Sequence, residues 1–276
     1  QHPPSAPGFA VDVMTRSRAP IGRWAIVALC VAFFAVPLVA LAIFSFTSGS
    51  GWTTAAYSAI FRDAQFWKSV GLSLLLAALT TVLSLALMVP TVLWVHLRAP
   101  QYRSLIEAIT LLVFAVPPIT LVIGASGLLL GLVPKLLGTP LILVPFYIVL
   151  SFAFTFRALD AGVKSVDLHT LVDAAHSLGA GTASTVLRVI LPNLRTAILG
   201  AAFLTITVVL GEYVLSSLFL YNTLPVYMAD VGTSQAQGAA ALALITVLFT
   251  WLLLIAVSVV SRRLGGQRVG TMIAST

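Results

Sequence analysis

Long apolar runs, separated by short polar segments, follow one another along almost the whole chain. Each run can hold the ~20 apolar residues that a helix needs to cross a bilayer. None has the alternating polar and apolar positions of a membrane β-barrel strand. The pattern therefore predicts an all-α integral membrane protein with six transmembrane helices, at about 24–46, 68–95, 104–129, 140–157, 194–220 and 238–261.

The composition supports this class. Hydrophobic residues make up 59% of the chain and charged residues 8%, whereas a soluble domain carries about 25% charged residues. The single cysteine, Cys30, lies in the first predicted span and cannot form an intrachain disulfide. We therefore expect neither redox chemistry nor a metal site in this chain.

The basic residues indicate the orientation of the spans. If both termini are cytoplasmic, twelve of the fifteen Lys and Arg residues lie inside and only Arg62, Lys68 and Lys135 lie outside. This bias is the positive-inside pattern of membrane proteins, and it predicts cytoplasmic termini. Because these residues flank the spans and do not cluster on one face, they account for the net charge of +7 without any nucleic-acid partner.

The N-terminal region has features of a secretory signal, with basic residues, an apolar run and the small residues around Ala42. The run continues to Phe46, however, and is longer than the ~7–15 residues of a signal core, so we expect a retained first span. Residues 1–23 are then a cytoplasmic tail, partly disordered or not native, with Met14 a candidate native start. Residues 24–265 form the membrane domain and 266–276 a cytoplasmic C-terminal tail.

The longest inner connection, 158–193, has helical periodicity of its own. One apolar face and one polar face predict a short amphipathic helix. The apolar face consists of Leu168, Leu171, Val172, Ala175 and Leu178, and the polar face of Asp167, Thr170, Asp173, His176 and Ser177.

Two glycines, Gly179 and Gly181, interrupt this helix and are suited to a sharp turn, since glycine readily adopts positive φ. A second periodic run follows, and we expect Pro192 to begin the fifth span because a first-turn proline gives up no helical hydrogen bond. The predicted unit is a helix, a glycine elbow and a second helix that continues into a span. Such a unit can carry a push at the elbow into the membrane.

The spacing of this segment resembles the cytoplasmic signature of bacterial ABC import permeases, Glu-Ala-Ala, three residues, Gly, nine residues, Ile, one residue, Leu-Pro. Here the first position is Asp instead of Glu, and Val189 replaces Ile. In that family this segment is the coupling helix that contacts the ATP-binding subunit. The resemblance assigns this contact to Asp173, Ala174, Ala175, His176, Leu178, Gly179, Leu191 and Pro192.

A bilayer-lying amphipathic helix is the alternative for this segment, but its polar face would carry Lys or Arg, not Asp, His and Ser. The chain also has no phosphate-binding Gly-x-x-x-x-Gly-Lys-Ser/Thr motif, because none of its lysines follows a glycine. It is therefore not expected to be an enzyme or to bind a cofactor.

The resemblance implies several partners in the bacterial cytoplasmic membrane. These are two ATP-binding subunits that hold ATP and Mg, a second permease subunit, and an extracytoplasmic solute-binding protein. The second permease is either a different chain, as the polyamine-like branch suggests, or a second copy of this one. Within the family, the segment 51–70 and Gly211-Glu212-Tyr213 most resemble the spermidine/putrescine-type branch, which implies a polyamine-like cation as solute. Ferric iron, phosphonate and other small anions remain alternatives from related branches.

Glu212 is the one acidic residue deep in a predicted span, ~12 Å below the outer end of its helix at 1.5 Å per residue. It could attract a cationic solute, with Tyr213 or Tyr221 stacking on the cation. It could equally hydrogen-bond neighbouring helices and hold the bundle together. Both hypotheses stay open at this point.

Pro117 and Pro118 predict a kink or interruption of the third span, which could line the substrate path or serve packing alone. Ser126 is placed on the same path; it also lies in a G-x-S-G resembling that of rhomboid-type intramembrane proteases. The four histidines lie in or beside cytoplasmic segments, far from its predicted depth, so helix packing is the preferred explanation. A passive channel would explain the spans but not the elbow.

Two further expectations concern polar residues outside the spans. Glu107 follows Arg103 by four residues, which predicts an interfacial ion pair between them. The outer segment 221–238 is expected to be a loop, either a docking surface for a binding protein or merely solvated.

Overall fold

The computed structural model describes residues 20–48, 51–132, 134–136 and 138–266, so most of the two predicted tails lies outside the described residues. A two-stranded hairpin, β1 and β2, pairs Thr47 with Trp52, and the described remainder is helical or connecting. The elements are α1 (Pro20–Phe46), β1 (Thr47–Ser48), β2 (Gly51–Trp52), α2 (Ala55–Arg62), α3 (Ala64–Arg98), α4 (Arg103–Leu112), α5 (Pro118–Leu132), α6 (Leu143–Lys164), α7 (Leu168–Ser177), α8 (Thr182–Thr185), a π-helical segment (Val186–Ile190), α9 (Leu191–Leu210), α10 (Val214–Leu218), α11 (Leu224–Ser234) and α12 (Ala236–Gly266), with short 3-10 turns at Pro100–Tyr102, Val113–Ala115, Pro134–Leu136 and Pro140–Ile142.

Four helical stretches within the described residues are long and apolar enough to cross a membrane, namely Trp24–Phe46, Ala64–Arg98, Pro140–Lys164 and Thr182–Leu210. Two shorter apolar helices, Pro118–Gly127 and Ala236–Leu252, accompany them. This confirms the all-α membrane class. The full set of six spans stays a prediction.

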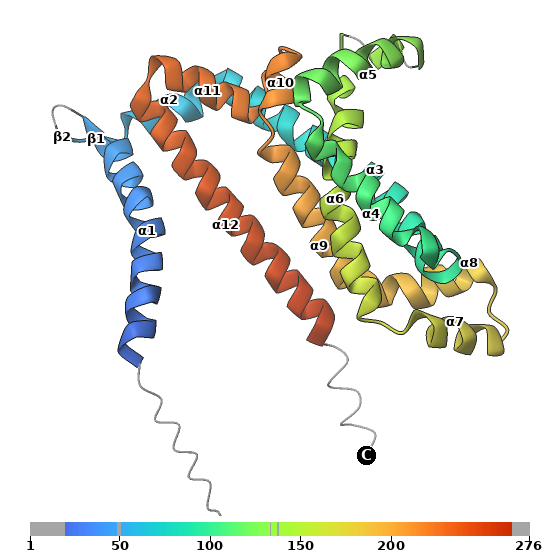
Figure 1. The fold of residues 1–276 in the computed structure, drawn as a ribbon. Coiled ribbons are helices and arrows are strands. Elements are labelled where there is room, and N and C mark those ends of the chain that lie inside the picture. Colours follow the sequence, from blue (N-terminus) through green and yellow to red (C-terminus); the bar gives the residue numbers. More distant parts are fainter. Residues whose placement is uncertain (1–19, 49–50, 133, 137, 267–276) are drawn as a thin grey trace, which may run out of the picture.

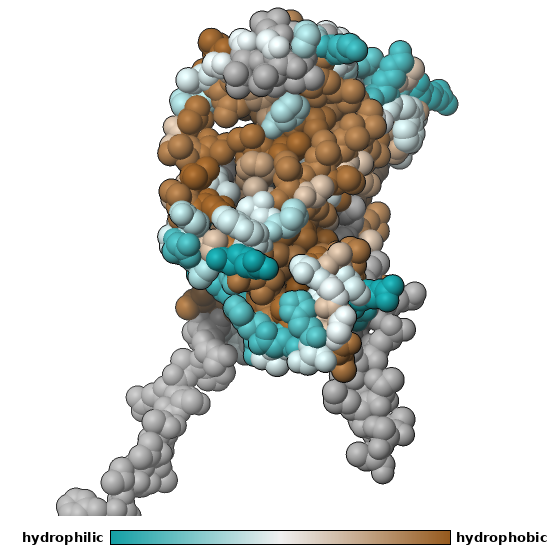
Figure 2. Space-filling model, turned by 90° about the vertical axis from the view of Figure 1, so that its right-hand side faces the viewer, coloured by the Kyte–Doolittle hydropathy of each residue, from teal (hydrophilic) through white to brown (hydrophobic). Residues whose placement is uncertain are grey.

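The long helices α1, α3, α6, α9 and α12 run between two ends of the molecule (Figure 1). Figure 1 shows that α1 begins, α12 ends and α7 and α8 lie at one end, while α2, α10 and α11 lie at the other. Figure 2 shows a broad hydrophobic band between more hydrophilic regions at the two ends. We call these the α7 end and the α11 end.

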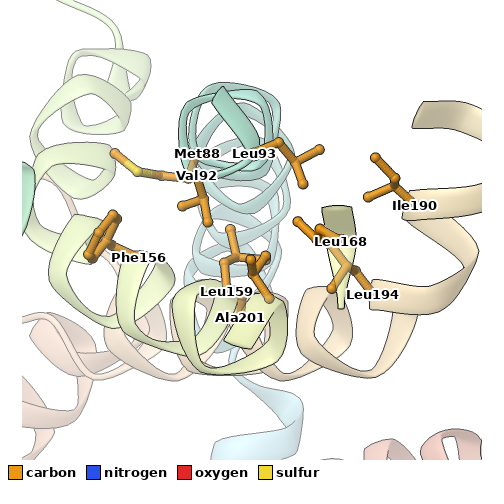
Figure 3. Close-up of a cluster of buried hydrophobic side chains, with 10 residues drawn as sticks. Met88, Val92, Leu93, Phe156, Leu159, Leu168, Ile190, Leu194 and Ala201 are labelled. Atoms are coloured by element: carbon orange, nitrogen blue, oxygen red, sulfur yellow. The ribbon is translucent and has the colours of Figure 1, made fainter. Parts of the chain in front are cut away.

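The core lies between α3, α6 and α9. Buried apolar side chains from all three helices meet near the α7 end, joined by Leu168 of α7 and Ile190 of the π-helical segment (Figure 3). Hydroxyl pairs also connect the helices, with Ser84 Oγ 3.0 Å from Ser151 Oγ and Thr155 Oγ1 3.0 Å from Thr205 Oγ1. Interhelical hydrogen bonds of this kind hold apolar helices in register.

The third predicted span is interrupted, as the two prolines indicated. A short 3-10 turn follows α4, and Val116 has extended backbone (φ −92°, ψ 120°) before α5 begins at Pro118. Residues that precede proline are biased away from helical backbone, and proline supplies no amide hydrogen. We call the segment 113–118 the first break.

The fifth predicted span is also interrupted, which corrects the expectation of one helix over 194–220. α9 ends at Leu210 and the short α10 begins only at Val214. Glu212 therefore does not lie on a continuous helix at a fixed depth. We call the segment 211–213 the second break.

At the α11 end, residues 224–234 form a helix, which corrects the expected loop. The hydroxyl of Tyr227 on α11 donates to Asp63 Oδ2 at 2.6 Å, and the other carboxylate oxygen of Asp63 accepts from the amide of Gln65 at 2.8 Å. Asp63 thus caps α3 and holds α11 against it. The Tyr227 hydrogen bond, followed by that of Gln65, lowers the pKa of Asp63, while burial and Asp63 raise the pKa of Tyr227 to about 12.

This contact predicts a defined pH dependence of stability. The contribution of Asp63 is present above its unfolded pKa of 3.8 and is lost as the pH falls through its lower folded pKa. The contribution of Tyr227 is present below its unfolded pKa of 10.0 and is lost as the pH rises to about 12. We expect the thermal midpoint of Tyr227→Phe to show smaller losses at both extremes than the parent protein. Asp230→Asn, an exposed position on the same helix, should retain the parent profile; equal profiles for all three would contradict the contact.

Candidate functional site: a coupling segment and two helix breaks

The amphipathic helix expected from the sequence is α7. Asp167 caps its first turn, with Oδ1 accepting from the Thr170 amide at 3.2 Å and Oδ2 from the Thr170 hydroxyl at 2.6 Å. These hydrogen bonds, the hydroxyl first, lower the pKa of Asp167. Leu168 and Ala175 are buried, and Val172 packs against the core beside them. The helix is therefore held to the bundle by its apolar face.

The elbow forms at Gly179, whose φ is +80°. Its amide donates to the His176 carbonyl at 2.9 Å, and the Ala180 amide donates to the Ala175 carbonyl at 3.0 Å, so the turn closes the end of α7. A left-handed residue at this place favours glycine. Leu178 corrects the sequence expectation: its side chain is not on the buried face but 88% exposed, because α7 ends at Ser177 and the chain turns away.

The second helix continues into the bundle without a gap. α8, the π-helical segment and α9 together form the helical stretch Thr182–Leu210. Pro192 lies in the first turn of α9, as expected, and the helical run before it continues into α9 without a gap. Proline removes one amide donor within this stretch, and the Nδ2 of Asn193 donates to the Val189 carbonyl at 2.6 Å. A displacement of the elbow can therefore be transmitted along one continuous helical stretch.

The residues assigned to coupling by resemblance divide into two groups. Ala175 is buried and Leu191 half-buried, so both belong to the support of the segment. The others are exposed: Asp173, Ala174, His176, Leu178, Gly179 and Pro192.

A cavity of about 640 Å³ lies between α7, α8 and the end of α3. Apolar side chains from α3 and the π-helical segment form part of its wall, including Leu93 and Val186. Its charged and imidazole groups make no side-chain hydrogen bond or ion pair with any residue that the structure describes; they are Arg98, His169, Asp173 and His176. This surface can accept a polar partner.

The two helix breaks line one small cavity of about 120 Å³. Val116 and Pro118 contribute from the first break, and Glu212 contributes from the second. Backbone that leaves helical geometry at membrane depth is tolerated where it is buried in protein or lines a cavity. The structure thus brings together two interruptions that are almost 100 positions apart in sequence.

The carboxylate of Glu212 is hydrogen-bonded to the helix that follows the second break. Its Oε1 accepts from the Leu215 amide at 2.8 Å and its Oε2 from the Ser216 amide at 3.3 Å. The carboxylate therefore caps α10, and neither of the two roles expected from the sequence included this one. The remaining path candidates do not line this cavity: Pro117, Tyr213 and Tyr221 lie outside its wall, and the Ser126 hydroxyl donates to the Val122 carbonyl.

This capping predicts different outcomes for two substitutions. Glu212→Gln keeps one acceptor and should retain thermal stability and transport. Glu212→Ala removes both acceptors and should cost about 0.5–2 kcal/mol, with reduced transport. Thermal midpoints and transport rates of the two variants, measured side by side, test this. Loss of transport in Glu212→Gln at unchanged stability would contradict the capping role and favour a charge that acts on the solute.

A charge cluster near the α7 end was missed in the sequence. Asp160 of α6, 7% exposed, accepts from Arg103 Nε at 2.7 Å and from a second Arg103 nitrogen at 3.0 Å, and lies 2.9 Å from His96 Nε2 and 2.7 Å from Lys164 Nζ. Glu107 instead lies 3.8 Å from Arg157, which corrects the expected pair of Glu107 with Arg103. In the sequence, the only sign of this cluster is that its residues fall at the predicted inner ends of spans.

Comparison with solved structures finds a similar fold. No protein-family model and no curated protein matches the sequence. Among solved structures, the fold is similar to that of a chain from a bacterial alginate ABC transporter, crystallised in complex with an alginate pentasaccharide-bound periplasmic protein. The TM-score is 0.62 at 15% identity, over 87% of this chain and 92% of that chain. At this identity the likeness establishes the fold, which is that of a helical chain in such a transporter complex.

Proposed function

We propose that this chain is a transmembrane permease subunit of an ATP-driven ABC importer. The observation that carries the proposal is the coupling segment, residues 168–190: a helix with one exposed face, a left-handed glycine turn and a second helical run that continues into α9. The fold likeness to a chain of an ABC transporter supports it independently of the sequence signature. A passive channel needs no such segment.

In this proposal, the ATP-binding subunits dock on the exposed side of α7. Asp173 and His176 offer charge and hydrogen bonds, and the exposed Leu178 offers an apolar contact beside the elbow. The unpaired groups of the neighbouring cavity give the partner further polar contacts. ATP and Mg are held by two such subunits, since this chain lacks a phosphate-binding motif. The α7 end is then cytoplasmic, in agreement with the basic residues.

The movement generated there reaches the two breaks. α9 begins beyond the coupling segment and ends at the second break, which shares a cavity with the first. We propose that these breaks move as the permease alternates between inward and outward access. A second permease subunit completes the path, and an extracytoplasmic binding protein delivers the solute at the α11 end.

The solute proposed first is a polyamine-like cation, which rests on segments 51–70 and 211–213 of the sequence. Glu212 adds little to it, because its carboxylate is already engaged by two backbone amides. The second candidate is an acidic oligosaccharide, since the similar transporter was crystallised with an alginate-bound partner.

The experiment is reconstitution of the chain in proteoliposomes with the ATP-binding subunits, permease and binding protein encoded beside it. Uptake of radiolabelled spermidine and of alginate oligosaccharide is measured under three conditions. These are vesicles that enclose ATP, vesicles without ATP, and vesicles that contain ATP and a hydrolysis-deficient ATP-binding subunit. The proposal expects uptake of a solute only with hydrolysis. Equal flux in all three conditions would identify a channel and overturn the proposal.

A further inference from the structure

The Asp160 cluster joins three helices at the α7 end. The carboxylate lies on α6, while His96 belongs to the last turn of α3 and Arg103 is the first residue of α4. Arg103 makes a two-pronged contact to both carboxylate oxygens, the geometry that fixes orientation most firmly. The Asp160 side chain is only 10% exposed. One buried carboxylate therefore sets how α3, α4 and α6 lie relative to one another.

The cluster also lies directly beside the support of the coupling segment. Leu159 and Val163 flank Asp160 on α6, and both pack in the same buried cluster as Leu168 of α7 (Figure 3 shows Leu159 and Leu168). Only 165–167 separate the end of α6 from α7. The buried side of α7 is therefore packed in the same cluster as the part of α6 that carries Asp160.

On the other side of the cluster, α4 leads to the first break. The helix is ten residues long, from Arg103 to Leu112, and the break begins at the next residue. A short, straight helix transmits a displacement of its first residue to its last with little loss. The chain of contacts thus runs from α7 through α6 and Asp160 to Arg103, α4 and the break that faces Glu212.

We infer that Asp160 is a positioning residue that couples movement of α7 to the first break through Arg103. This inference rests on the proposed function and adds a second route beside the direct one through α9. A buried ion network is a poor source of net stability, because desolvation offsets its attraction, but it defines one arrangement of its helices. Energetic coupling through such a network must be measured, since contiguity alone does not establish it.

The test reads movement at the break without knowledge of the solute. In a Cys30→Ser background, which removes the chain's one cysteine, Val116→Cys places a thiol in the first break. The complex with its ATP-binding subunits is labelled with a membrane-impermeant maleimide, without nucleotide and after trapping with ATP and vanadate. In the reference complex we expect the two labelling rates to differ. In Asp160→Asn we expect the ratio of these two labelling rates to move toward one by a factor of about 2 to 30, while ATP hydrolysis is retained.

A neighbouring substitution is the matched control. Glu107→Gln removes the other ion pair between α4 and α6, which is 3.8 Å long and exposed. This variant should leave the labelling ratio unchanged. If Asp160→Asn does not assemble, Arg103→Lys decides by the same ratio, because it keeps the charge but loses the two-pronged contact.

The outcomes separate the inference from the proposed function. A reduced ratio in the deciding variant, with the control unchanged, supports the inference. An unchanged ratio in an assembled complex that hydrolyses ATP overturns the inference alone. A reference complex that hydrolyses no ATP overturns the proposed function, and the inference with it.

Discussion

Gly179→Pro is expected to uncouple ATP hydrolysis from transport while the complex still assembles. Proline is held near φ −65°, whereas Gly179 has φ +80°, and the substitution also removes the amide that donates to the His176 carbonyl. A misplaced proline costs about 3 kcal/mol, which corresponds to roughly a 100-fold loss in the population of the native elbow. Solute transported per ATP hydrolysed, in reconstituted vesicles, should fall by a comparable factor.

Gly181→Pro is the matched control, two residues further along the same turn. Gly181 has φ −73°, a value that proline adopts, and its amide donates no hydrogen bond to any described residue. A Cβ would meet nothing within 4 Å at either glycine, so steric contact does not distinguish the two positions. Transport should therefore survive in Gly181→Pro. Equal transport in both variants would show that the left-handed turn is not needed for coupling.

The elbow could be predicted from sequence because its cause is local. Glycine between two amphipathic runs is favoured wherever a chain must turn with positive φ, and no distant residue is required. The first break was predictable for the same reason, since Pro117 and Pro118 disrupt helical backbone by their own chemistry. Local signals of this kind survive in almost any tertiary environment.

The second break and the charge cluster could not be predicted, because their causes are not local in the same sense. Gly211 alone is a weak helix breaker, and the interruption is completed when the Glu212 side chain caps α10. Asp160 finds partners 57 and 64 positions away in the sequence. The i,i+4 pairing rule therefore assigned Arg103 to Glu107, while the folded chain offered Arg103 a buried carboxylate instead.

Leu178 shows a further reason for disagreement. Its position in the helical period places it with the buried residues, but the period applies only while the helix continues. α7 ends one residue earlier, so the backbone turn presents Leu178 to solvent. An exposed leucine next to a glycine elbow is thus a product of the helix end, and it creates the apolar contact proposed for the ATP-binding subunit.

Gly162→Ala is expected to destabilise the bundle by about 1–3 kcal/mol, although alanine is the better helix former. Gly162 of α6 faces Ala197 of α9, and a Cβ added at Gly162 would overlap the Cβ of Ala197. Such small residues allow two helix backbones to approach closely. The thermal midpoint of the purified protein, followed by tryptophan fluorescence, measures the effect.

Exchange of the two side chains tests whether this overlap is the cause. In Gly162→Ala/Ala197→Gly, the single methyl group moves from α9 to α6 and the space between the helices is filled once, so most of the lost stability should return. Gly200→Ala, on α9 where a Cβ meets nothing within 4 Å, should be neutral or stabilising by up to about 1 kcal/mol. If the double variant is no more stable than Gly162→Ala, the close approach of α6 and α9 at this point does not limit the packing. Because α6 leads into the coupling segment and α9 leads out of it, recovery in the double variant would show that the space between these two helices holds one methyl group at this point.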